Sequence, residues 1–303
     1  MRTLQFSGGP RIGVEGDNAS IFYASHWLEK IGLATAPLAE IEQPSVVLVA
    51  GDASRVAASP TAKASTEGLS RIVLWDFQTA MTGTGLHAAA ASGVSWVLGR
   101  EDGLPLAMPV DVPEKWCGLV GANFAVSVLL EANLNQTVAT RSVDISAADT
   151  LRSFADQNSG NETEMDADWQ RNGRTAVGHG GIYPQGYYPC RDGHVGLIGR
   201  SRKDWAAIRD VVGRPAWTDE ERFGDPFKLA DDSAEVDVLL TAALSQFDRD
   251  DLLARAVEYG APLAPVYVQD ELVAREVVRR EFFSADGSAN LPFEIVPRSS
   301  QAR

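Results

Sequence analysis

The chain has few cysteines and histidines, and their positions argue against a metal centre and a disulfide framework. Its two cysteines, Cys117 and Cys190, do not form a Cys-x-x-Cys pair, and its four histidines lack the spacing of metal ligands. We therefore expect no metal and no permanently bound cofactor.

Basic charge and long apolar runs are also scarce. The 303 residues include 27 basic and 41 acidic side chains, and the net charge of −14 argues against nucleic acid or an anionic membrane surface as the main partner. No apolar run approaches the ~18 residues of a membrane span, and the opening MRTLQFSGG lacks the pattern of a signal peptide. The sequence predicts a soluble, cytoplasmic protein.

The first half of the chain alternates strand-like and helix-like segments. The continuous apolar runs VVLVA and RIVLW, at 46–50 and 71–75, are typical of buried parallel strands. Helical patterns and one further strand complete the alternation; the helices are expected at 18–31, 86–98, 117–132 and 147–157, and the strand at 138–146. This order predicts an α/β fold, a Rossmann-like doubly wound parallel sheet over 1–157.

The second half predicts a smaller α+β domain over 187–270. A polar, helix-poor stretch and a glycine loop at 158–186 are expected to link the two domains. The segment 187–199 predicts a β-hairpin with its turn at Arg191, Asp192 and Gly193. Helices are expected at 202–212, 233–247, 249–258 and near 270–280, and 271–303 is expected to return toward the large domain.

The segment LPLAMPVDVPEKWCG at 104–118 predicts a helix N-terminus that carries two carboxylates. Proline is favoured at the first helical position and acidic residues in the first turn, as at Pro113 and Glu114, with Asp111 just before them. The positive end of the helix would keep Glu114 ionised and available as a nucleophile. A simple capping role for Asp111 and Glu114 is the alternative.

A glycine cluster, Gly178, His179, Gly180 and Gly181, stands at the entrance to the second domain. Consecutive glycines can present backbone N–H groups to an anion or a developing oxyanion. A flexible hinge is the alternative interpretation. The other glycine clusters, including GTG at 83–85, do not match a dinucleotide-binding fingerprint.

Several segments, in order along nearly the whole chain, resemble family III CoA-transferases of the CaiB/BaiF type. This family includes formyl-CoA transferase, carnitine CoA-transferase and α-methylacyl-CoA racemase. The segments that carry the resemblance are RIGVEGDNASIFYASHWLEKIGLAT, GTGLHAAAASGVSWVLG, VDIS, GIYPQGYYPCRDGHVGL, EYGAPLAPVYVQDEL and the EFF at 281–283. The chain is divergent and shorter than its relatives.

The resemblance implies a nucleophilic carboxylate at Glu114. The family has an aspartate four positions before a glycine that opens a buried helix, and counting back from Gly118 gives Glu114, with Asp111 as the fallback. In the racemases of the family, the catalytic histidine falls at Thr84. His87, three residues on, is expected to face the core, so racemisation is disfavoured.

The activity that the resemblance implies is CoA transfer between an acyl-CoA and a small carboxylic acid. Glu114 would form a mixed anhydride and then a glutamyl-CoA thioester, with Gly180 and Gly181 as oxyanion donors. The candidate cations for the phosphates of CoA are Arg100, Arg141, Arg171 and Arg174, each of which can equally be solvated surface charge.

Three departures from the family bear on this implied function. Glutamate replaces the usual aspartate, the family's basic nucleotide-binding segment is missing between 51 and 70, where Arg55 and Lys63 remain, and the chain stops soon after LPFEIVP. A non-catalytic or weakly catalytic partner subunit of a heteromeric transferase is therefore the second hypothesis. The resemblance also implies an interlocked dimer, either of two copies or with a related subunit.

Overall fold

The chain divides into two compact units, which are described separately. The computed structural model describes residues 12–52, 68–99, 102–109, 111–135, 137–138, 140–156 and 183–275. The large unit comprises Met1–Gly99, Leu104–Trp169 and Ser284–Arg303, and the small unit comprises Arg100–Gly103 and Gln170–Phe283. Most of the expected linker and return segment lies outside the described residues.

A parallel five-stranded sheet forms the centre of the large unit. Its strands are β1 (Ile12–Glu15), β2 (Thr35–Pro37), β3 (Val46–Ala50), β4 (Ser70–Trp75) and β5 (Ser142–Ser146), in the order β2-β1-β3-β4-β5. Each neighbouring pair runs parallel. The predicted parallel α/β architecture is confirmed, and β5 is shorter than the strand expected from Val138.

The described helices of the large unit follow the predicted order with one interruption. They are α1 (Ala19–Lys30), α4 (Gly85–Ala91), α5 (Val94–Val97), α6 (Val112–Asn135) and α7 (Ala147–Asp156), with a short 3-10 turn at Leu38–Glu40. The single helix expected at 86–98 is divided into α4 and α5, because Gly93 adopts a left-handed conformation with φ of +86°. Helix α6 starts at Val112, next to the start predicted at Pro113, and extends beyond the 117–132 run at both ends.

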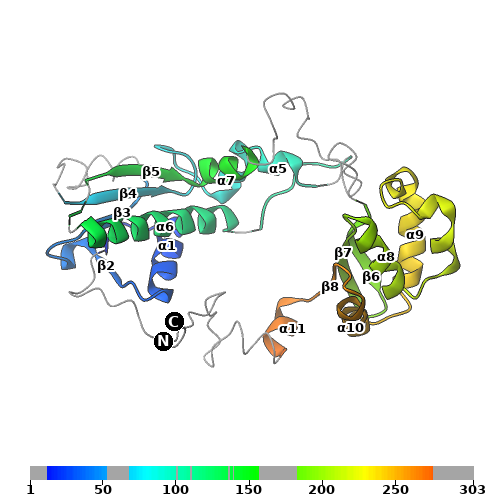
Figure 1. The fold of residues 1–303 in the computed structure, drawn as a ribbon. Coiled ribbons are helices and arrows are strands. Elements are labelled where there is room, and N and C mark those ends of the chain that lie inside the picture. The colour runs from blue at the N-terminus through cyan, green and yellow to red at the C-terminus, as the bar shows by residue number, and fades with distance from the viewer. Residues whose placement is uncertain are drawn as a thin grey trace, which may run out of the picture. The chain divides into compact units, whose positions relative to one another are not determined.

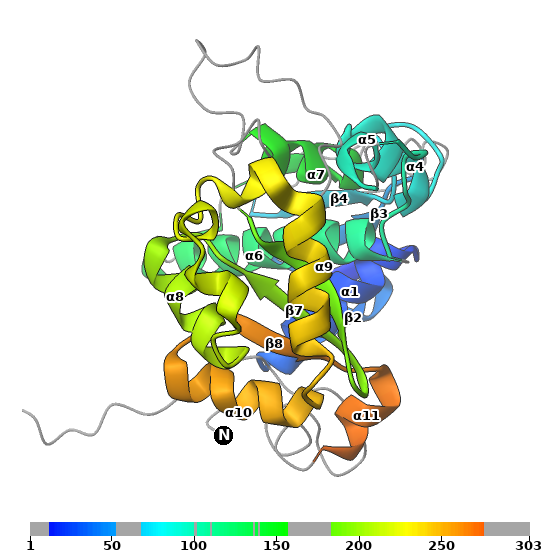
Figure 2. The same cartoon turned by 90° about the vertical axis from the view of Figure 1, so that its right-hand side faces the viewer.

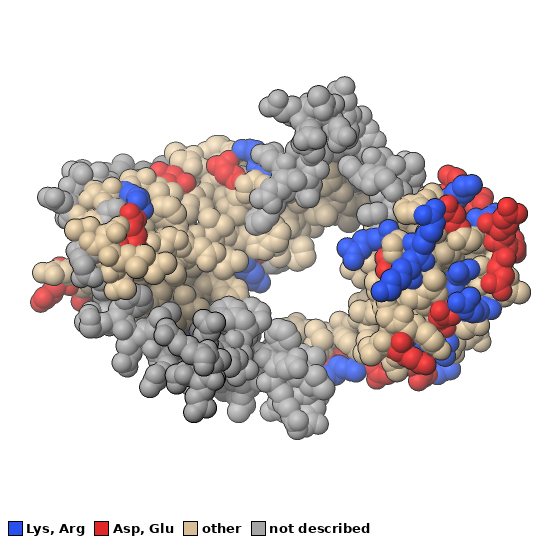
Figure 3. All heavy atoms as spheres, viewed as in Figure 1, with Lys and Arg blue, Asp and Glu red and all other residues tan. Residues whose placement is uncertain are grey.

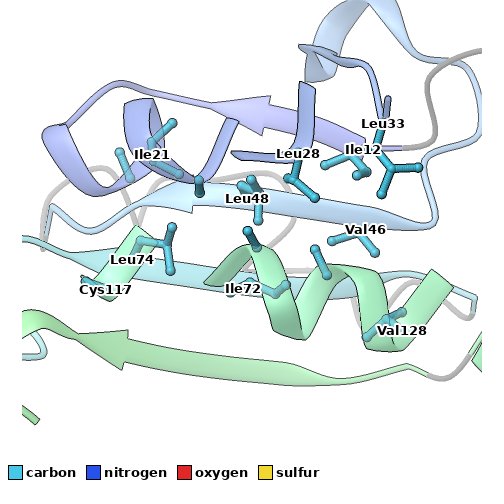
Figure 4. Packing of buried hydrophobic residues seen from close by; sticks show 14 of the residues in the cluster. Ile12, Ile21, Leu28, Leu33, Val46, Leu48, Ile72, Leu74, Cys117 and Val128 are labelled. Carbon is cyan, nitrogen blue, oxygen red and sulfur yellow. The ribbon is translucent and has the colours of Figure 1, made fainter. Parts of the chain in front are cut away.

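Helices α1 and α6 pack together on one face of the sheet (Figures 1 and 4). Ile21 and Leu28 of α1 and Val128 of α6 meet Leu48 and Ile72 of the sheet in one buried cluster. The two helices approach closely because Gly118 has no side chain, and a Cβ there would lie 2.6 Å from the Ser20 carbonyl oxygen.

Helix α6 alone among the described helices is long and apolar enough to cross a membrane, with a mean hydropathy of 1.5 over its most apolar window. This helix corrects the expectation that no apolar run approaches the length of a membrane span. Because α6 packs against α1 and the sheet and 44% of that window is buried, we interpret it as the core helix of the large unit.

The small unit is built on an antiparallel sheet with helices packed around it (Figure 2). The strands are β6 (Gln185–Cys190), β7 (Gly193–Ile198) and β8 (Leu263–Val266), and the helices are α8 (Arg202–Val211), α9 (Ser233–Leu244), α10 (Arg249–Tyr259) and α11 (Gln269–Ala274). Three 3-10 turns lie between α8 and α9, at Ala216–Asp219, Glu221–Phe223 and Leu229–Asp232. The predicted hairpin is confirmed, and its two-residue turn is Arg191 and Asp192.

Candidate active site

The carboxyl edge of the parallel sheet is fixed to the start of α1 by polar contacts. Asp76, directly after β4, accepts hydrogen bonds from the backbone N–H groups of Ala19 at 3.1 Å and Ser20 at 2.9 Å. Asn18 caps the same helix through the Ile21 N–H, at 2.8 Å, and its side-chain amide donates to the Leu74 carbonyl at 2.8 Å. Ligands of open parallel sheets bind outside this edge.

Glu114 lies in the first turn of α6 at this edge and is buried, with 4% of its surface exposed. Its Oε1 accepts a hydrogen bond from the backbone N–H of Gly85, the first residue of α4. Its Oε2 is buried and has no hydrogen-bond partner among the described residues. One carboxylate oxygen is therefore anchored, and the other is left with unused acceptor capacity.

Burial raises the pKa of Glu114 above its ordinary value of 4.5. The N–H groups of Glu114 itself and of Gly85 act in the opposite direction, whereas the negative charges of Asp76 and Asp111 raise it further. The backbone donors at the helix N-terminus lower the pKa, but the loss of water around the charge outweighs them, so the net shift is upward. That the helix N-terminus keeps this carboxylate ionised stays a prediction.

Asp111 lies just before α6 in a left-handed conformation with φ of +62°. The hydroxyl of Tyr23 donates to its Oδ2 at 3.1 Å, and the Lys115 N–H donates to its backbone carbonyl at 2.8 Å. Burial, followed by the contact with Asp111, raises the pKa of Tyr23. Asp111 thus starts α6 and binds α1, and one of its carboxylate oxygens is already engaged.

His87 does not face the core as the sequence analysis expected. It is exposed, and its Nδ1 accepts from the Thr84 N–H at 3.2 Å and lies 3.1 Å from Thr84 Oγ1. Its ring lies against Phe77, with 5.6 Å between the ring centroids. These contacts stabilise the first turn of α4, which carries Gly85.

The other predicted site residues are not brought to Glu114 within the described residues. Arg141 precedes β5 at the opposite edge of the sheet and makes a two-pronged ion pair with Glu131, at 2.6 and 3.0 Å. The glycine cluster at Gly178, His179, Gly180 and Gly181 lies outside the described residues, and so do Arg55, Lys63, Arg100, Arg171 and Arg174.

Sequence reasoning missed three residues around Glu114, namely Tyr23, Asp76 and Gly85. Asp76 carried a usable signal, because an acidic residue directly after a buried parallel strand lies at the ligand-binding edge. Gly85 belongs to the GTG cluster that was set aside for lacking a dinucleotide fingerprint. In the part of the chain that the structure describes, no group of three or more His, Cys, Asp or Glu side chains is arranged to hold a metal ion.

Comparison with known proteins gives this arrangement a family context. The chain resembles the solved structure of a CaiB/BaiF family protein from Brucella suis, with a TM-score of 0.68, 18% identity, and coverage of 86% of this chain and 70% of that one. It also resembles the hypothetical protein Rv3272 from Mycobacterium tuberculosis, with a TM-score of 0.71, 15% identity, and coverage of 95% and 93%. At these identities, the likeness shows the fold alone.

No curated protein sequence matches this chain at a significant level. The family model described as CoA-transferase family III matches residues 77–294, which is more than two thirds of the chain. The match includes Gly85 and Glu114 as well as the described part of the small unit. The chain therefore belongs to CoA-transferase family III.

Proposed function

We propose that the chain is an acyl-CoA:carboxylate CoA-transferase in which Glu114 accepts the acyl group. Family membership supports a CoA-transferase or a racemase-type activity. Thr84 stands where the racemases' histidine falls, and exposed His87 is engaged with Thr84, so transfer is favoured over racemisation.

One observation supports Glu114 more than any other: its Oε1 is anchored by Gly85 while its Oε2 is buried without a partner. A carboxylate that has lost its water and retains a free lone pair is predisposed to attack a carbonyl carbon. Access to Oε2 requires the covering residues to move, because Glu114 is almost fully buried.

In the first half of the reaction, Glu114 attacks the thioester carbonyl, the carbon–sulfur bond breaks and CoA leaves as a thiolate, which gives a mixed anhydride. The thiolate then attacks the glutamyl carbonyl and releases the donor acid. In the second half, the acceptor carboxylate attacks the glutamyl thioester, the carbon–sulfur bond breaks and CoA leaves as a thiolate, which gives a second mixed anhydride. The thiolate then attacks the acyl carbonyl of that anhydride and releases Glu114. The products are the second acyl-CoA and the free Glu114 carboxylate.

Backbone N–H groups of Gly180 and Gly181 remain our proposed oxyanion donors. Arg100 is retained as a candidate cation for the phosphates of CoA. Arg141 is less suited to that role, because Glu131 already engages its guanidinium.

Chemical trapping tests the assignment of Glu114. Incubation with an acyl-CoA and hydroxylamine should convert Glu114 to a hydroxamate, detectable by mass spectrometry of the α6 peptide. Asp111→Asn should still form the hydroxamate. A product on Asp111, or full activity in Glu114→Gln with none in Asp111→Asn, would show that the wrong carboxylate has been named.

The missing basic nucleotide-binding segment between 51 and 70 supports a second candidate, a non-catalytic or weakly catalytic partner subunit. Thermal-shift titration separates the two. A transferase that binds CoA or acyl-CoA in its folded state is stabilised by mass action, and its Tm rises with ligand concentration. A chain that shows no shift with any acyl-CoA, and forms no hydroxamate, fits the partner-subunit role.

We also propose that the protein works as a dimer, of two copies or with a related subunit. The outer face of α6 supports this, since it exposes Leu119, Val120, Leu130 and Leu134. Between Lys115 and Glu131 the helix carries no charged residue, and in Figure 3 the surface over the middle of α6 is tan, the colour of uncharged residues. An apolar face of this kind is characteristic of an interface. Sedimentation that shows a folded monomer at nanomolar concentration would contradict the proposal.

A further inference from the structure

We propose that Gly85 is a positioning residue for Glu114: its N–H fixes one carboxylate oxygen, and its missing side chain makes room for the other. The catalytic consequence rests on the proposed function, whereas the size match between positions 85 and 114 does not. Residue 85 thereby sets which acidic side chain can occupy position 114.

Gly85 and Glu114 are in such close contact that no side-chain atom fits on Gly85. A Cβ built on Gly85 would overlap Oε2 of Glu114 and would lie 2.6 Å from both its Cδ and its Oε1. Such separations are far inside van der Waals contact, so the carboxylate would have to move. Any movement away from residue 85 also breaks the hydrogen bond from its N–H.

Glycine is not required at position 85 by the backbone, because Gly85 is absent from the residues with positive φ. It lies in the first turn of a helix, where alanine is normally favoured over glycine. The reason for glycine at this position is therefore the neighbouring carboxylate, and an added methyl group acts on Glu114 rather than on the conformation of α4.

Hydrogen bonds between neighbouring residues fix the first turn of α4, and they thereby fix the position of the Gly85 N–H. The Ala88 N–H donates to the Thr84 carbonyl at 3.0 Å, and the Thr84 N–H donates to His87 at 3.2 Å. Just before this turn, a Cβ on Gly83 would lie 2.6 Å from the Phe77 ring. The start of α4 thus packs against Phe77, and the backbone at position 85 cannot easily move away from Glu114 to make room for a larger side chain.

Side-chain length completes the argument. Aspartate at position 114 would withdraw the carboxylate by one carbon–carbon bond, about 1.5 Å. It would give up the contact with the Gly85 N–H, and it would leave room for a Cβ at position 85. The combined size of the two side chains therefore suits glycine at position 85 with glutamate at position 114, or alanine at position 85 with aspartate at position 114.

A double-mutant cycle tests the proposal; it compares the wild type, Gly85→Ala, Glu114→Asp and the variant that carries both substitutions. The two readouts are the rate of hydroxamate formation at residue 114 and the Tm. In Gly85→Ala we expect the rate to fall about 100-fold, because a displacement near 1 Å costs that much. The Tm should fall by roughly 5 °C. Leu86→Ala, a change on the exposed side of the same turn, is the matched control and should alter neither readout.

The second pair of variants separates positioning from a general effect on folding. Adding Gly85→Ala to Glu114→Asp should cost at most about 1 °C and less than threefold in rate, so the two substitutions are strongly coupled. Equal losses from Gly85→Ala in both backgrounds would overturn the proposal, and so would a Gly85→Ala protein that matches the wild type. If the wild type forms no hydroxamate, the proposed function fails. The inference about position 85 is then decided by the Tm values alone, that is, by whether Gly85→Ala costs less in the Glu114→Asp background than in the wild type.

Discussion

The two units of the molecule differ in where they hold their most distinctive charged side chains. In the small unit, arginines meet carboxylates at the surface, as Arg191 does with Asp248 and Arg222 with Glu235. The large unit buries a carboxylate, Glu114, that has no cationic partner among the described residues. Figure 3 shows the contrast, with charge crowded on the small unit and sparse on the visible face of the large one.

The difference separates structural charge from functional charge. Exposed ion pairs contribute little to stability, since water and salt screen them. A buried carboxylate without a cation destabilises the fold, and such groups collect at sites of chemistry. We therefore expect the chemistry of the protein to lie at Glu114 in the large unit, which has fewer described ion pairs.

The largest expected effect comes from removing the buried carboxylate. Glu114→Gln should lower kcat for CoA transfer by about 1,000-fold or more, because the covalent route is lost. Asp111→Asn should cost less than about tenfold. Steady-state transfer between an acyl-CoA and a free acid measures both, and comparable losses in the two variants would remove the distinction between these carboxylates.

Next in size is a cavity in the core of the small unit. Leu240 of α9 is fully buried, so Leu240→Ala should destabilise the protein by about 2–5 kcal/mol in urea unfolding. The neighbouring exposed Val238→Ala is the control and should stay within about 0.5 kcal/mol. Equal effects would mean that α9 does not pack as described.

A smaller effect links Glu114 to the pH dependence of stability. Because burial raises its folded pKa above 4.5, Glu114 binds its proton more tightly in the folded state. The stabilisation that this tighter proton binding adds to the free energy of unfolding is fully present below about pH 4.5. It is lost as the pH rises through the raised folded pKa. Glu114→Gln should therefore raise the Tm by about 3 °C at neutral pH, and the gain should vanish in acid. A gain that is the same at every pH would refute the link.

The smallest expected effect concerns the surface pairs of the small unit. The two-pronged pair with Arg222 holds the pKa of Glu235 below its ordinary value of 4.5, so the pair persists at neutral pH. Arg222→Gln should lower the Tm by less than about 2 °C, and 0.5 M salt should reduce the difference. A larger loss that ignores salt would show that Arg222 acts through packing.

Local patterns in the sequence predicted most of the fold. The apolar runs at β3 and β4 gave buried strands, and the turn at Arg191 and Asp192 gave the hairpin, because such signals depend on neighbouring residues. One helix was expected where α4 and α5 stand, because an isolated glycine such as Gly93 does not by itself end a helical pattern. Strand β2, with three residues, lacks the length for a periodic signal.

The candidate site was only partly predictable. Glu114 was found from its place before Gly118 and its helix start, both of which are local in the sequence. Its burial, its raised pKa and its contact with Gly85 depend on residues 29 positions apart that tertiary packing brings together. No local pattern fixes the space between two such residues.

Cys117, three residues after Glu114, has a practical consequence of its own. It is fully buried between α6 and the sheet, and burial raises the pKa of its thiol to about 12, so in the closed structure it is almost entirely unreactive toward alkylating reagents. The rate at which Cys117 is labelled under native conditions therefore measures how often α6 separates from the sheet.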